Sequence, residues 1–596
     1  MNRIFSLIQF VLIFVCIVIH TSCGDDFLTK TPPALLSGSQ LEDQRGVEGL
    51  LVGAYNPMRG GEMFGGAMGV DWTYASCAAD DAYKGSEEGD QSNFNQVERY
   101  NPQPNNPYMA SRWRDCYNGV SRCNMTLEFL KSAQAGATPI PAARAAQIEG
   151  EAKYLRAWYH FSANRIFKNI PYVRTPAEQG GKLAEEIPNK DAGWAEMEAD
   201  LDFAIANLPE QWRAAEVGRA TKYAAQTLKA QALMYQGKLT QAKPLLDAVL
   251  AGPFELVPNY NDNYNENTEN NKESIFEIQC SQTATHRTGL RFAGAVMIQP
   301  TGPAAIGWGF YQPSQCLVEA FQVTDDGLPI IDINNRAEVK NDMNTPSTVA
   351  FTPTDQLLDL RLDWTVMRRG VDFNGWGICP GASWVRLQSN GGPYMTKKYM
   401  HFQSSQSRQA GSGFDNDRNF RYHRLAHVIL WRAEIAVEEG EFELARTLVN
   451  RIRERVKTST PVMGLCTATI IPSTGVVAGV DYTKPAANYK TEPYPAGHVA
   501  FSTKENAREA VRLEIRLEFA TEGQRFFDLR RWGQFTDPVD GKPYDEYVLN
   551  DFIARDSKFR TFMTGVKYDK SKRYWPVPQA QLDIQRGVLE QDPDYK

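Results

Sequence analysis

The chain has 596 residues, of which 42% are hydrophobic and 23% are charged, so it can bury one or more large apolar cores. Its formal net charge is −7 at pH 7, and it contains no long basic run. This acidic balance argues against a protein that binds nucleic acid. Aromatic residues make up 11% of the chain, enough to serve both a core and a surface that binds a ligand.

Residues 1–22 have the three parts of a secretory signal peptide. Arg3 supplies the positive charge, and residues 7–19 (LIQFVLIFVCIVI) form the apolar run. This run is shorter than the roughly 20 residues that a membrane-spanning helix needs, which favours a cleaved signal over a retained anchor helix. We expect no membrane-spanning segment later in the sequence, because no later stretch is long and apolar enough.

Cys23 follows the small residues Thr21 and Ser22, an arrangement that resembles the lipid-attachment site of bacterial lipoproteins. His20 departs from that pattern, which usually has leucine here, although Ile19 is adjacent. Acidic residues come next, as in some lipoproteins exported to the outer face of the Gram-negative outer membrane. We therefore predict a lipid anchor at Cys23, with several acyl chains, and an extended tether over residues 23–40.

Seven cysteines remain beyond the signal and the anchor, an odd number that excludes a complete disulfide framework. They are Cys77, Cys116, Cys123, Cys280, Cys316, Cys379 and Cys466. Cys116 and Cys123 are two helical turns apart and could be neighbours. Because the sequence has no CxxC motif, we predict mostly buried thiols and no structural zinc.

Strong helical patterns cover residues 113–130 and 141–168. Pro141 suits the first turn of the second helix, and Pro171 follows its end. Both stretches carry apolar residues at helical spacing. We expect two long helices, each with an apolar face.

Residues 221–250 and 422–455 resemble each other, and each predicts a helix, a glycine turn and a second helix. Aligning the turns pairs three small residues of one copy with three of the other: Gly237, Ala230 and Ala242 with Gly440, Ala433 and Ala445. Small residues at these positions let two antiparallel helices approach closely. The pattern is typical of tetratricopeptide-like repeats, with a chance likeness of two amphipathic hairpins as the alternative.

Helical periodicity fades over residues 256–415, where glycine, proline, asparagine and aromatic residues become more frequent. A second loop-rich stretch covers residues 458–502. Long loops of this kind in a compact chain usually carry function. The last strong helical pattern covers residues 504–529.

Several of these stretches together resemble the SusD/RagB family of outer-membrane lipoproteins. The likeness lies in the start at Cys23 and in residues 151–173, 311–330, 508–533 and 574–595. Residues 508–533 contain the sequence Glu-Gly-x-Arg-x-x-Asp-Leu-x-Arg-Trp-Gly, which starts at Glu522. Residues 574–595 contain Pro-x-Pro and Gln-x-Pro-x-Tyr. His427 departs from the aspartate usual at its position. The resemblance spans nearly the whole chain after the signal.

We expect a mostly α fold, in which tetratricopeptide-like helical pairs form a scaffold and a loop-rich, irregular second half packs on it. The predicted regions are a SusD-like N-terminal helical region at 41–255 and a RagB/SusD-like C-terminal region at 256–596. The latter contains the insert 256–415 and helices at 420–457 and 504–530.

The resemblance implies a non-catalytic protein that is lipid-anchored in the outer membrane and faces the cell exterior. Such a protein binds an oligosaccharide or polysaccharide and passes it to a SusC-like TonB-dependent transporter. No cofactor is implied. A peptide-binding member of the same family and a surface glycan-degrading enzyme are the alternatives.

Three groups of residues invite a chemical role, and for each we favour a structural one. Asp80 and Asp81 form an acidic pair of the kind a glycosidase uses, but such pairs are common among 71 acidic residues. His423 and His427 are four apart, as metal ligands on a helix are, yet Arg424 lies between them. Residues 522–532 are expected to form an ion-pair network that closes a helix end. We therefore predict no catalytic residues and no metal site.

Ligand binding is expected to rest on aromatic side chains in loops, because sugar C–H groups pack favourably on the face of an aromatic ring. The candidate ligand-binding residues are Trp72, Tyr74, Trp308, Tyr311, Trp376 and Trp384. For each of them a core position is the alternative.

Overall fold

The computed structural model describes residues 41–60, 71–280, 282–283, 286–287, 308–398, 400–408, 418–466 and 479–596. The signal peptide 1–22, the lipid-anchor residue Cys23 and the tether 23–40 lie outside the described residues and stay predictions. Helices predominate in the described part, and its strands are short and pair two by two. None of the helices described is long and apolar enough to cross a membrane.

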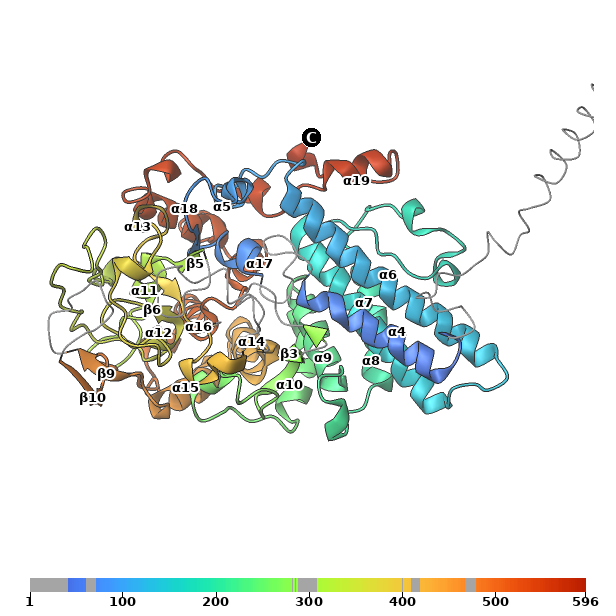
Figure 1. Cartoon of the computed structure of the whole chain (residues 1–596), viewed down its shortest axis with the longest axis horizontal. Coiled ribbons are helices and arrows are strands. Elements are labelled where there is room, and N and C mark those ends of the chain that lie inside the picture. The colour runs from blue at the N-terminus through green and yellow to red at the C-terminus, as the bar shows by residue number, and fades with distance from the viewer. Residues whose placement is uncertain are drawn as a thin grey trace, which may run out of the picture.

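A stack of helices forms one end of the molecule, where α4, α6, α7 and α8 lie side by side (Figure 1). Their bounds are α4 Gln44–Tyr55, α6 Pro107–Ala135, α7 Ala142–Phe167 and α8 Trp194–Asn207. Helix α6 begins where the Asn106 side chain accepts a hydrogen bond from the Tyr108 N–H, and α7 follows Pro141. The two long helices predicted at 113–130 and 141–168 are confirmed, and α6 is longer than expected at both ends.

The two predicted hairpins are also present, as α9 Lys222–Met234 with α10 Leu239–Leu250, and α14 Leu425–Glu438 with α15 Phe442–Thr458. Gly237 and Gly440 have positive φ angles of 70° and 80° at the turns. The four aligned alanines have no exposed surface: Ala230, Ala242, Ala433 and Ala445. Helix α10 packs directly on α14, so the stack continues across the 174 residues of chain between them.

Two predicted helices are wrong in part. Residues 422–424 belong to strand β8 Phe420–Arg424, which pairs antiparallel with β2 Ser274–Ile278. The predicted helix 504–529 is two helices, α16 Lys504–Phe519 and α17 Arg525–Phe535. At the break, Gly523 has φ 77°, and a Cβ there would lie 2.8 Å from the Asp71 nitrogen, so the chain turns where only glycine fits.

The remaining helices are short, apart from α18 Tyr544–Asp556. They are α5 Asn95–Glu98, α11 Gln315–Ala320, α12 Arg361–Thr365, α13 Gln388–Gly391 and α19 Gln579–Ile584. The other strand pairs are β1 Ala82–Gly85 with β5 Phe310–Pro313, β3 Gln282–Thr283 with β4 His286–Arg287, β6 Val366–Met367 with β7 Met395–Thr396, and β9 Met463–Cys466 with β10 Val480–Pro485.

The largest apolar core contains residues from both predicted regions, from Val47 to Leu589. Trp575, near the C-terminus, packs its ring 5.5 Å from that of Tyr74 and donates its backbone N–H to the Ile166 carbonyl at 2.9 Å. The predicted regions 41–255 and 256–596 are therefore separate only in the sequence, because residues of both contribute to one apolar core. Six of the seven described cysteines are buried, as predicted.

Candidate functional site

Residues 518–522, around the end of α16, are held by a buried ion-pair network. The guanidinium of Arg424 lies 2.6 Å from Glu518, 2.8 Å from Glu273 and 2.9 Å from Glu522. Lys398 also binds Glu522 at 2.9 Å. Burial alone would raise the pKa of Glu522, but the two cations lower it to about 2. This network joins the end of β8 to the end of α16 and to the residue before β2, and it leaves none of these carboxylates facing solvent.

The network predicted at 522–532 is confirmed as a packed one. Arg531 binds Asp528 and Glu434, each at 2.8 Å, while Arg530 donates to two backbone carbonyls. Arg525 binds Asp80 at 2.8 Å. All of these side chains are buried or nearly so, which supports the structural role expected of them.

Asp80 and Asp81 are buried acids with arginine partners. Burial would raise the pKa of Asp80, but Arg516 and Arg525 outweigh it and lower the pKa to about 2. For Asp81 burial prevails, and its pKa is raised although Arg516 lies 3.0 Å away. Asp80 is committed to two guanidinium groups, so this pair lacks the free carboxylates that glycoside cleavage requires.

His423 and His427 lie on different elements, because His423 belongs to β8 and only His427 to α14. Burial lowers the pKa of both rings, that of His427 to about 3, so both are neutral at pH 7. The His427 ring stacks on Phe519 with 4.0 Å between centroids. No group of side chains in the described part of the chain is arranged to hold a metal ion.

Three of the six aromatic candidates are core residues, which corrects the prediction for them. Trp72 packs 5.4 Å from Tyr311, and at most 1% of either side chain is exposed. The Tyr311 hydroxyl lies 2.8 Å from Ser76 Oγ, and Tyr74 donates to the Tyr108 carbonyl. Residues 72–76 form a single π-helical turn that packs on α17, which turns these rings inward. A ligand cannot reach their faces.

The other three candidates lie nearer the surface. Trp384 is 8% exposed and packs 6.3 Å from Phe373. Trp376 is partly exposed and donates its indole N–H to the His401 carbonyl at 2.9 Å. Trp308 is also partly exposed, two residues before β5.

Trp308 lies beside a cluster of charged loop residues that sequence reasoning missed. Arg386 Nη1 is 2.9 Å from both Asp90 and Ser86, its Nη2 binds Glu87, and Nη1 also reaches the Trp308 carbonyl at 3.5 Å. We call Ser86, Glu87, Asp90, Trp308 and Arg386 the Trp308 surface. Its charged side chains are partly exposed, 27% for Arg386 and 49% for Glu87. No motif marks Arg386, whose acidic partners are almost 300 residues away.

Lys84, on β1, stabilises the loop at residues 86–90 of the Trp308 surface. Its Nζ donates to the carbonyls of Glu87, Glu88 and Asp90 at 3.0, 3.1 and 2.7 Å. Lys84 itself is buried, and burial lowers its pKa to about 8. These three bonds tie the loop to β1 and restrict its shape.

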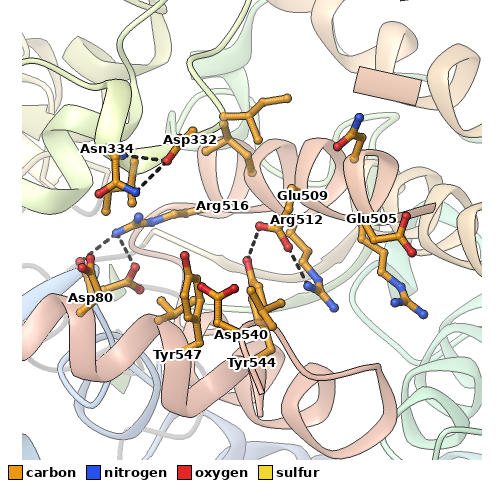
Figure 2. Close-up of a pocket in the computed structure, with 18 of the residues that line it drawn as sticks. Asp80, Asp332, Asn334, Glu505, Glu509, Arg512, Arg516, Asp540, Tyr544 and Tyr547 are labelled. Atoms are coloured by element: carbon orange, nitrogen blue, oxygen red, sulfur yellow. Dashed lines mark hydrogen bonds and ion pairs between the residues drawn. The ribbon is translucent and has the colours of Figure 1, made fainter. Parts of the chain in front are cut away.

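A cleft of about 820 Å³ lies between α16, α18, and the loops 331–336 and 537–540, and we call it the α16–α18 cleft. Figure 2 shows Tyr544 and Tyr547 reaching from α18 toward α16. The Tyr544 hydroxyl donates to Glu509 at 2.8 Å, and the Arg512 guanidinium covers its ring at 3.8 Å. Asp80 and Arg516 close the deep end. Its size suits a small-molecule or sugar ligand.

Comparison with known proteins shows which families this chain resembles. The chain matches the model of the SusD family over residues 272–595 and the family described as "Starch-binding associating with outer membrane" over residues 26–233. It is 21% identical to a SusD-like protein of Formosa agariphila, over 98% of each chain.

Solved structures with the same fold include surface glycan-binding protein A from Bacteroides uniformis, with a TM-score of 0.65 and 21% identity over 93% of this chain and 100% of that one. The protein of the same name from Bacteroides thetaiotaomicron, in complex with laminarihexaose, has a TM-score of 0.64 and 20% identity over 92% and 99%. Since the first family model alone covers more than half of the sequence, the chain belongs to the SusD family.

Proposed function

We propose that this protein binds an oligosaccharide at the bacterial cell surface without cleaving it and delivers it to a partner TonB-dependent transporter. Membership of the SusD family supports the proposal, as do the glycan-binding relatives that share its fold. The predicted signal peptide and the lipid-anchor residue Cys23 are consistent with export to the outer membrane.

The observation that carries the proposal is the Trp308 surface. It combines a partly exposed tryptophan with planar, partly exposed arginine and carboxylate groups. Sugar rings are bound by stacking on aromatic faces and by hydrogen bonds from their hydroxyls to such planar polar groups. We place the main ligand contact here, with Trp376 and Trp384 as further candidates.

Two features favour binding over catalysis. Asp80, the carboxylate at the deep end of the α16–α18 cleft, is paired with arginines, and Glu509 on its wall is bound to Arg512 and Tyr544. Each of these carboxylates would have to leave a partner before it could transfer a proton to a sugar. A peptide ligand remains the alternative within the same family.

The first test is affinity electrophoresis of the purified protein through gels that contain different polysaccharides, followed by calorimetry with oligosaccharides of the retained glycan. Trp308→Ala should raise the Kd about tenfold, because losing one aromatic stacking contact costs about 1.4 kcal/mol. Trp194→Ala, a partly exposed tryptophan on α8 in the helical stack, is the matched control and should bind as the wild type does.

Three results would contradict the proposal. They are unchanged glycan binding by Trp308→Ala, release of new reducing ends from the bound glycan, and binding of peptides with no retention by any glycan. A glycan that binds the wild type about tenfold more tightly than it binds Trp308→Ala would support it.

The anchor is tested separately. Cys23→Ala should move the protein from the membrane fraction to the soluble fraction of the cell, because the acyl chains supply the membrane affinity. Equal membrane retention of Cys23→Ala and the wild type would refute the anchor while leaving glycan binding intact.

A further inference from the structure

One arginine of the α16–α18 cleft has no acidic partner. Arg336 lines the cavity, and its Nε and Nη2 donate to the Ile330 and Ile331 carbonyls of its own loop at 2.9 and 3.1 Å. Within the described residues, its guanidinium forms no ion pair and its Nη1 has no hydrogen-bond partner. Three of the five N–H donors of this charged group are therefore left for something that enters the cleft.

The other arginines of the cleft are paired, which makes Arg336 an exception. Arg512 binds Glu509 at 2.8 Å and Arg508 binds Glu438 at 2.7 Å. Arg516 and Arg525 share Asp80, and Arg516 also binds Asp81. The deep end of the cleft thus holds three guanidinium groups against two carboxylates.

The surplus positive charge is costly in this position. Burial and the neighbouring Arg516 lower the pKa of Arg336 to about 10, so the group stays charged at neutral pH. A partly buried cation without a counter-charge is unfavourable, and an anion that completes the pair relieves this cost. Guanidinium groups bind carboxylate and sulfate oxygens with well-matched planar geometry.

The acidic residues at the mouth do not cancel this charge. Asp537 and Asp551 are bound to Arg508 and Arg555 at 2.7 and 2.8 Å. Asp332, Asp540 and Glu505 form no ion pair within the described residues, and they are exposed, so solvent and salt screen them. Tyr547, partly exposed on α18, offers a ring face between the mouth and the deep end (Figure 2).

We propose that the α16–α18 cleft binds the carboxylate or sulfate group of an acidic sugar through Arg336, with Tyr547 against the sugar ring. This inference rests on the proposed function, because it takes a glycan as the ligand. It adds a second binding site that shares no residue with the Trp308 surface, and it predicts that the natural glycan is acidic.

The test uses the full-length protein in detergent at low salt, with glucuronate, inorganic sulfate and glucose as probes in titrations followed by NMR. Either anion should bind the wild type with a millimolar Kd, and glucose about tenfold more weakly or not at all. Arg336→Met should remove the preference for anions, and Arg336→Lys should retain part of it. Arg213→Met, a control on an arginine whose side chain is 78% exposed, should change nothing.

Binding of glucuronate without sulfate would identify a uronate as the ligand, and the reverse would identify a sulfate ester. The proposal is overturned if neither anion binds the wild type, or if Arg336→Met binds both as the wild type does. A thermal midpoint of Arg336→Met equal to or above that of the wild type would show that lost binding does not reflect misfolding. If anion binding fails while Trp308-dependent glycan binding persists, only this inference fails. If the wild type binds no glycan at all, the proposed function fails with it.

Discussion

The helical hairpins and the loop-rich segment 308–408 are held in shape by different interactions. In the hairpins, alanines without exposed surface let helices touch, and each turn is closed by local backbone bonds. In segment 308–408, single buried polar side chains donate to distant carbonyls. Gln312 reaches those of Gly392 and Tyr394 at 3.0 and 3.1 Å, and Lys397 reaches those of Asp363 and Asp372 at 2.6 and 2.7 Å.

The difference explains how loops can present a preformed binding surface. An irregular backbone cannot satisfy its own carbonyls through regular secondary structure, so buried donors must do so. In this protein the donors come from segment 308–408 itself, and the Arg424 network ties β8 to the end of α16. The helical stack supplies a platform, and the buried polar bonds give the loops above it a fixed shape.

Arg424→Met should produce the largest loss of stability. Removing one partner of a buried ion-pair network leaves Glu518, Glu522 and Glu273 with fewer counter-charges, which costs about 3–5 kcal/mol of unfolding free energy. Urea denaturation measures this loss. Arg213→Met, which breaks the exposed pair with Glu216, should cost less than about 1 kcal/mol. Equal losses of unfolding free energy in the two variants would show that the Arg424 network contributes no more than an exposed ion pair.

The acid dependence of stability should be large and should trace partly to Glu522. Its pKa is lowered in the folded protein from an ordinary value of 4.5 to about 2, so its stabilising contribution is complete above pH 4.5 and is lost as the pH falls toward 2. Glu522→Gln should therefore differ most from the wild type above pH 4.5, by up to about 3 kcal/mol. A difference in unfolding free energy that stays constant from pH 6 to pH 2, measured in urea, would contradict this account.

Gln312→Leu should weaken the loop-rich segment alone. The change leaves two buried carbonyls without their amide donor, at a cost of about 2 kcal/mol. Hydrogen exchange should quicken in residues 308–313 and 391–396 and stay unchanged in α9 and α10. Gln134→Leu, at an exposed position on α6, is the control for the substitution itself. Faster exchange throughout the chain would mean that the two regions unfold as one unit.

The sequence predicted the helical part well because its signals are local. Proline before α7, the glycines at 237 and 440 and the repeated alanines all act within a few residues of the structure they specify. Strand β8 was missed because it has a helix-like apolar pattern and is defined only by pairing with β2, some 150 residues earlier. The break at Gly523 was missed for the same reason, since the close contact there is with Asp71.

The candidate site was predicted only in part. Trp308 is partly exposed, but Trp72, Tyr74 and Tyr311 are buried, and composition cannot distinguish an aromatic residue in the core from one at the surface. Arg386 and Arg336 carry the charges that matter most to the proposed sites. Their roles depend on which carboxylates lie near them in space, and that information is absent from any local stretch of sequence.

The proposed function requires that a sugar binds to the loop-rich face and leaves the hydrogen exchange of the helical hairpins unchanged. Hydrogen exchange followed by mass spectrometry, with and without a saturating glycan retained in the affinity gels, tests this directly. We predict slower exchange in residues 82–90, 308–313 and 384–388, and no change in α9 and α10. Slower exchange confined to the helical hairpins, or no change anywhere at saturation, would contradict it.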